Sequence, residues 1–86
     1  MVESAIITVL DKNDVSLGDF ELPVKVTVRD LSSKMIAFLK AKDYDTYENL
    51  SALSIQHNGR VLDEEETLYE NGIWDGSFLK IVFEEN

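Results

Sequence analysis

The sequence has no cysteine, one proline, four glycines and one histidine among its 86 residues. Without cysteine, the chain forms no disulfide and offers no thiolate to a zinc ion or to nucleophilic catalysis. The scarcity of proline and glycine argues against a collagen-like or low-complexity chain, and no linker or internal repeat interrupts the sequence. We therefore expect one globular domain spanning residues 1–86.

Basic residues are also few. Eight lysines and arginines stand against seventeen aspartates and glutamates, which gives a formal net charge of -9 at pH 7. Such a charge repels phosphate backbones and anionic lipids, so we expect no nucleic-acid partner and no direct membrane insertion. The apolar runs are too short to span a bilayer, and no basic segment at the start suggests a signal peptide. We expect a cytoplasmic protein.

Catalytic and metal-binding motifs are missing as well. His57 precedes the turn-forming pair Asn58-Gly59, a place typical of a solvated strand end rather than of a general base. No serine elbow, glycine-rich phosphate loop or zinc-protease motif occurs. Asp43 could begin a calcium loop, but the sixth and twelfth positions hold Glu48 and Ser54 in place of Gly and Glu. We expect a non-enzyme with no cofactor and no metal.

The first half of the chain predicts two strands and a helix. Residues 6–10 are rich in β-branched side chains and end at a cluster of turn-forming residues. Residues 20–24 alternate apolar and polar, and Pro23 predicts that this strand lies at a sheet edge or ends there. Thr27 is a favourable N-cap, and apolar residues recur at helical spacing from Val28 to Lys42. This segment is the one main helix.

The second half predicts a connecting loop, with room for a short turn of helix, and then more strands. Residues 43–49 break the helical periodicity, and residues 53–56 alternate as a strand. Asn58-Gly59 is typical of a two-residue hairpin turn, after which residues 60–62 return as a short strand. Turns at Asn71-Gly72 and Asp75-Gly76 precede a last strand over 78–83. The order predicts an α+β fold with a mixed four- to five-stranded sheet packed on one main helix, the β-grasp pattern.

From Ile7 to Phe83 the chain resembles a ubiquitin-like β-grasp domain. The second half carries most of the resemblance, through Asn58-Gly59-Arg60-Val61-Leu62, Thr67-Leu68, Gly72-Ile73 and Leu79-Lys80-Ile81. The resemblance implies a core that the periodicity also selects. Its members are Ile7, Val9, Phe20, Leu22, Val28, Leu31, Met35, Ile55, Leu62, Leu68, Ile73, Leu79 and Ile81.

Within ubiquitin-like proteins, the chain is most similar to the YukD/EsaB family, which accompanies type VII (WXG100) secretion systems. Three features carry this similarity: the strand Phe20-Glu21-Leu22 before a valine-rich helix start, the long loop over residues 44–49, and the turn over residues 71–76 followed by the last strand. The similarity implies an accessory or adaptor protein. Its expected partners are cytoplasmic parts of the secretion machinery or its substrates.

The sequence ends in Phe83-Glu84-Glu85-Asn86 and not in Gly-Gly. Because conjugation of a ubiquitin-like protein uses a flexible glycine tail, we expect this chain not to be conjugated. Two alternatives remain open: a ubiquitin-like modifier with a processed or unusual tail, and a ubiquitin-like interaction domain excised from a larger protein. A weak homodimer is a third alternative, since exposed strand edges can pair between chains.

The candidate partner-binding residues follow from what replaces the hydrophobic docking patch of ubiquitin. The resemblance places Gln56, Lys80 and Val82 at the corresponding strand positions, so only Val82 keeps the apolar character. Parity places the side chain of Phe78 away from the core, and we expect Trp74 and Tyr69 to add exposed aromatic surface. The alternative for Trp74 is that it covers the edge of the core with its N–H in water.

Overall fold

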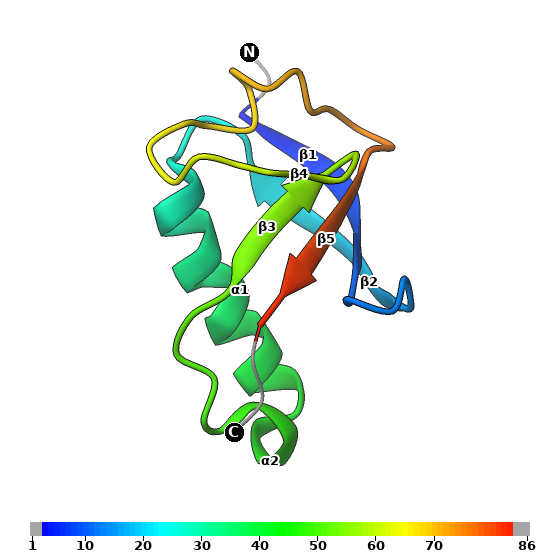
Figure 1. The fold of residues 1–86 in the computed structure, drawn as a ribbon, viewed down its shortest axis with the longest axis vertical. Coiled ribbons are helices and arrows are strands. Elements are labelled where there is room, and N and C mark those ends of the chain that lie inside the picture. The colour runs from blue at the N-terminus through cyan, green and yellow to red at the C-terminus, as the bar shows by residue number, and fades with distance from the viewer. Residues whose placement is uncertain (1–2, 84–86) are drawn as a thin grey trace.

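The computed structural model describes residues 3–83. The elements in chain order are β1 (Ser4–Leu10), β2 (Ser16–Pro23), α1 (Val28–Lys42), α2 (Tyr44–Tyr47), β3 (Ser54–His57), β4 (Arg60–Val61) and β5 (Phe78–Val82). The strands form one sheet in the order β2-β1-β5-β3-β4, and α1 runs along one side of it (Figure 1). β1 and β5 are parallel, and the other neighbours are antiparallel. The predicted α+β fold is confirmed, with five strands.

The hydrophobic core lies between the sheet and α1. Every second residue of the central strands points into it, as Ile7 and Val9 of β1 and Leu79 of β5 show. The helix contributes the stripe Val28, Leu31, Met35 and Leu39. Twelve of the thirteen predicted core residues are buried, namely Ile7, Val9, Leu22, Val28, Leu31, Met35, Ile55, Leu62, Leu68, Ile73, Leu79 and Ile81.

The thirteenth predicted core residue, Phe20, is only partly buried and packs at the margin of the core. Its ring stacks on Phe38 of α1 with the ring centroids 6.1 Å apart. Leu39, the neighbour of Phe38, is the residue that the helix buries. Phe38 instead extends the apolar surface toward β2.

The turn between β3 and β4 has the backbone that its sequence predicts. Asn58 and Gly59 have φ angles of 52° and 80°, both in the left-handed region that a two-residue type I′ hairpin turn requires. Gly59 is suited to this conformation because it has no Cβ. The strands that leave this turn are short, and β4 contains only Arg60 and Val61. The hairpin therefore closes the sheet on the side opposite β2.

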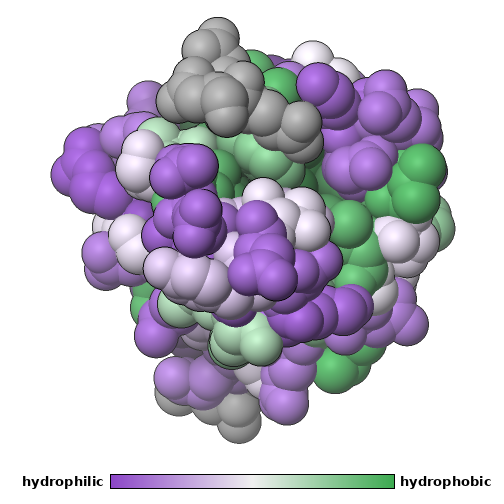
Figure 2. All heavy atoms as spheres, turned by 90° about the horizontal axis from the view of Figure 1, so that it is seen from below, coloured by the Kyte–Doolittle hydropathy of each residue, from purple (hydrophilic) through white to green (hydrophobic). Residues whose placement is uncertain are grey.

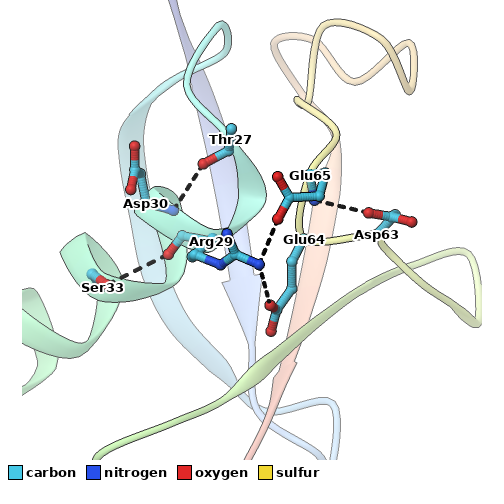
Figure 3. Close-up of polar contacts among 7 residues, drawn as sticks. All are labelled: Thr27, Arg29, Asp30, Ser33, Asp63, Glu64 and Glu65. Carbon is cyan, nitrogen blue, oxygen red and sulfur yellow. Dashed lines mark hydrogen bonds and ion pairs between the residues drawn. The ribbon is translucent and has the colours of Figure 1, made fainter.

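The start of α1 is fixed by a side-chain cap and by contacts from residues 63–66. The Thr27 Oγ1 accepts a hydrogen bond from the Asp30 backbone N–H at 3.2 Å (Figure 3). The Arg29 guanidinium lies 3.3 Å from a carboxylate oxygen of Glu64 and 2.5 Å from one of Glu65. These ion pairs are exposed, so they contribute little to stability compared with the cap. The cap is therefore the polar interaction here whose loss should be measurable.

We expect Thr27→Ala to lower the free energy of unfolding by about 1 kcal/mol, because the Asp30 N–H loses its acceptor. Urea unfolding followed by circular dichroism measures the difference. Thr27→Ser is the matched control, since serine keeps the hydroxyl and is at least as good an N-cap. An equal loss of stability in both variants would show that the threonine methyl group, and not the cap, stabilises this end of α1.

Charged side chains lie on the surface of the protein. Among residues 3–83, no polar or charged residue is buried. Figure 2 shows the end of the molecule that carries α2, where hydrophilic side chains cover most of the view and hydrophobic ones gather toward its right side. Neither helix in the described part of the chain has the length and apolar character that crossing a membrane requires.

Candidate functional site

The candidate site is the face of the sheet that points away from α1. We call this the outer face. It follows from the strand alternation, because each of its members in β1, β3 and β5 lies next to a core residue in its strand. Its residues are Ile6, Thr8, Leu10, Gln56, Val61, Phe78, Lys80 and Val82.

The strand register brings these side chains together across three strands. Phe78 on β5 lies beside Thr8 on β1, and Lys80 lies beside Leu10. On the other side of β5, Lys80 pairs with Gln56 of β3. Directly paired residues on one face have Cβ atoms about 4.5–5.5 Å apart, so their side chains form one continuous surface. Four of the six predicted site residues therefore lie on this face: Gln56, Phe78, Lys80 and Val82.

Large apolar side chains on the outer face are exposed. Phe78 is 60% exposed, and Val61, which pairs with Gln56, is 58% exposed. Ile6 is 50% exposed although the adjacent Ile7 is fully buried. Neither Ile6 nor Val61 is among the predicted site residues. The sequence does indicate the orientation of Ile6, because successive strand residues point to opposite faces and a buried Ile7 turns Ile6 outward.

Lys80 lies at the centre of the outer face and is held by an ion pair. Its Nζ is 2.8 Å from Oδ1 of Asp14, a residue of the turn between β1 and β2 with a φ of 64°. The Lys80 side chain is about one third exposed. A hollow of about 210 Å³ opens beside this pair, with Phe78 and Gln56 in its wall. The centre of the face is thus polar and pre-positioned, with apolar side chains around it.

Three carboxylates surround the Ile6 side of the outer face. The Thr8 hydroxyl donates to Oδ1 of Asp19 at 2.6 Å, and the Ser4 hydroxyl donates to Oε2 of Glu21 at 2.8 Å. The backbone N–H of Ile6 donates to Oδ1 of Asp75 at 2.7 Å. These hydrogen bonds fix the positions of the charges beside an exposed apolar side chain. This side of the outer face is therefore suited to a partner that presents basic side chains around an apolar contact.

The other two predicted site residues, Tyr69 and Trp74, form a separate surface on the connection between β4 and β5. Their ring centroids are 5.3 Å apart in an edge-to-face arrangement. The Lys25 Nζ lies 5.4 Å from the centre of the Tyr69 ring, within cation–π range. Tyr69 and Trp74 are 50% and 42% exposed. The six predicted residues thus divide into an outer-face group and this aromatic pair.

Asp43 and His57 lie at the ends of secondary-structure elements. The carboxylate of Asp43, where a calcium loop could have begun, caps α2 by accepting from the Thr46 N–H and hydroxyl. His57 ends β3 and is partly exposed. In the part of the chain that the structure describes, no three histidine or acidic side chains are grouped to hold a metal ion. The tail predicted to prevent conjugation lies, beyond Phe83, outside the described residues.

Residues 5–81 match the family model described as WXG100 protein secretion system (Wss), protein YukD. The comparison with curated proteins gives no match. Among solved structures, the chain is similar to the ubiquitin-like domain of the Mycobacterium tuberculosis type VII secretion system protein EccD1. This similarity has a TM-score of 0.73 at 22% identity, and it covers 96% of this chain and 100% of that one.

Two further solved structures have the same fold. The ubiquitin-like domain of EccD5 from Mycobacterium xenopi matches with a TM-score of 0.73 at 14% identity, covering 99% of both chains. A chain of the MycP5-free ESX-5 inner membrane complex matches with a TM-score of 0.75 at 17% identity. That match covers 99% of this chain and 22% of the other. At these identities the similarities establish the ubiquitin-like fold.

Proposed function

Because the chain belongs to the YukD family of WXG100 secretion system proteins, we propose that it is a non-catalytic adaptor of a type VII secretion system. It acts as one ubiquitin-like domain, residues 1–86, in the cytoplasm, and it binds protein parts of the machinery or its substrates. The matching part of the ESX-5 chain supports this proposal, because there a domain of the same fold belongs to a chain of an inner membrane complex.

The observation that carries the proposal is the exposed outer face. Soluble proteins expose single apolar residues routinely, but this face gathers several large exposed apolar side chains around a polar centre, as interaction sites often do. Phe78, Ile6 and Val61 are each half exposed or more, and no helix or strand formed by residues 3–83 covers them. Phe78 is the proposed anchor, because aromatic side chains supply much of the binding energy in small interfaces.

The chemistry of the outer face favours binding over catalysis. Its apolar members can bury surface, and Gln56 can donate and accept hydrogen bonds. Lys80 is committed to its ion pair with Asp14. None of these side chains forms the nucleophile–base pair that covalent catalysis requires. The family, the fold and this composition together support a docking role without a reaction.

The proposal is tested by deleting the gene in its native cells and measuring export of WXG100 proteins. We expect export to fall strongly and to be restored by the intact chain. A chain that lacks residues 84–86 separates adaptor from modifier, because an adaptor works through its folded surface and should restore export equally well. Normal export from the deletion strain would contradict the adaptor role, and failure of the shortened chain would favour a modifier.

A further inference from the structure

The second strand has one side that no other strand covers. β2 is the first strand in the sheet order and pairs only with β1. The N–H groups of Ile6 and Thr8 in β1 donate toward the β5 side, to Asp75 and to the Ser77 carbonyl. Along a strand, the backbone N–H and C=O groups of successive residues point alternately to the two neighbouring strands. The backbone groups of Ile7 must therefore point toward β2 and hydrogen-bond with those of Phe20.

It follows that Asp19 and Glu21 point their backbone N–H and C=O groups away from the sheet. No strand formed by residues 3–83 pairs with these groups. The open stretch has defined ends. At one end the Lys42 ammonium donates to the Leu17 carbonyl at 3.0 Å, and at the other Pro23 has no N–H to donate. The edge thus offers a short window with two donors and two acceptors.

The two sides of this window differ in chemistry. On the helix side, the 44% exposed ring of Phe38 stacks on Phe20 and forms an aromatic shelf beside the strand. Lys34 and Lys42 lie one helical turn before and after Phe38, so this side is apolar with positive flanks. On the outer side, the exposed carboxylates of Asp19 and Glu21 are held in place by the hydroxyls of Thr8 and Ser4.

We propose that this edge of β2 is a second docking site, which binds an extended protein segment with the pattern basic–apolar–basic. An added strand would use the backbone groups of Asp19 and Glu21. The residues of the added strand that lie opposite Asp19 and Glu21 would be on the same face of the sheet as these two carboxylates. Lysine or arginine at these positions would meet a negative charge. The residue between them points to the other face and rests on the shelf of Phe20 and Phe38. Because the outer side is negative and the helix side has positive flanks, the basic residues of the segment should lie on the outer side and its apolar residue on the helix side.

A second copy of this chain is a poor occupant of the same edge. If two β2 strands paired antiparallel about Phe20, Asp19 of one copy would lie opposite Glu21 of the other. Like charges directly opposite each other destabilise a strand pair. The edge therefore discourages the weak homodimer that strand pairing would otherwise allow, while it attracts a basic segment.

The test uses the full chain and a blocked peptide of about six alternating lysine and valine residues. Backbone amide NMR shifts and hydrogen exchange report where the peptide binds. We expect protection of the Asp19 and Glu21 amides, and an affinity at least about tenfold higher than that of the same peptide with glutamate in place of lysine. A control peptide with the same composition, but with its lysines and valines in two blocks, should bind about as weakly as the glutamate peptide.

Two variants locate the site. Glu21→Pro removes an outward N–H and the side-chain contact with Ser4, but it removes no backbone hydrogen bond to β1, so it should abolish protection while the sheet remains folded. Phe38→Ala removes the shelf and should weaken binding at least about fivefold. Equal binding of the alternating and block peptides, shifts outside β2 and α1, or a stable dimer in light scattering would overturn the proposal. Because the peptide is synthetic, the result does not depend on the secretion role.

Discussion

Ile7→Ala should destabilise the protein more than any surface substitution considered above. Ile7 lies in the middle of the central strand β1 and has no exposed surface. Truncation of a buried isoleucine removes apolar contacts and leaves a cavity, which costs about 2–5 kcal/mol. Small domains have about 5–15 kcal/mol of stability, so this loss is a large part of the total. We expect the melting temperature to fall by roughly 10–30 °C in calorimetry.

Ile6→Ala is the matched control, because it makes the same chemical change one residue earlier. Ile6 points to the outer face and is 50% exposed. Its truncation should cost less than about 1 kcal/mol, the usual scale for strand positions on a solvated face. Equal losses in the two variants would contradict the register of β1, since a shift by one residue exchanges the two faces.

Phe78→Ala should weaken capture of the partner by roughly thirtyfold, which corresponds to about 2 kcal/mol of binding free energy. Phe78 is the most exposed large apolar residue of the outer face, and the hollow beside Lys80 lies next to it. A partner that covers this face would bury the ring. Enrichment of the partner on the tagged variant, relative to the unchanged chain, is measured by quantitative mass spectrometry.

Tyr44→Ala is the control for this prediction. Tyr44 is an aromatic residue of almost equal exposure, 59%, but it lies in α2, away from the sheet. We expect it to leave capture unchanged. Circular dichroism should show that both variants are folded. Equal loss of capture in the two variants would mean that general surface hydrophobicity, and not the outer face, retains the partner.

The fold could be predicted from the sequence to a large extent, because local signals and the apolar pattern agree. Thr27 caps α1 and Asn58-Gly59 forms the hairpin turn, as these residue types predict. Pro23 ends the edge strand β2, as expected of a residue that has no N–H to donate to a neighbouring strand. Each of these residues determines local geometry by itself, so no knowledge of the tertiary structure was needed.

The candidate site was less predictable, because a surface is made by register and not by local preference. The alternation along β5 identified Phe78 as outward-facing, and the pairing of β3 with β4 then places Val61 beside Gln56 on the same face. Trp74 lies on an irregular connection, where alternation gives no information about direction. Its contact with Tyr69 therefore emerged only from the folded structure. The ion pair of Lys80 with Asp14 likewise depends on a turn distant in sequence.

The polar centre of the outer face distinguishes this chain from ubiquitin itself. The resemblance places Gln56 where ubiquitin has the central isoleucine of its docking patch, and Lys80 beside it. In this structure the two residues are direct neighbours across β3 and β5. A partner that requires a continuous apolar centre would leave their polar groups without partners, which is costly in a buried interface. The proposed partners therefore differ from the receptors of ubiquitin.

The most direct test of the adaptor role is affinity capture of the tagged chain from its native cells, followed by mass spectrometry of the bound proteins. We expect components or substrates of the type VII secretion machinery to be enriched, and we expect denaturation to release them because no covalent bond forms. A covalent, mass-shifted adduct, or enrichment of no secretion protein above an untagged control, would exclude the adaptor role.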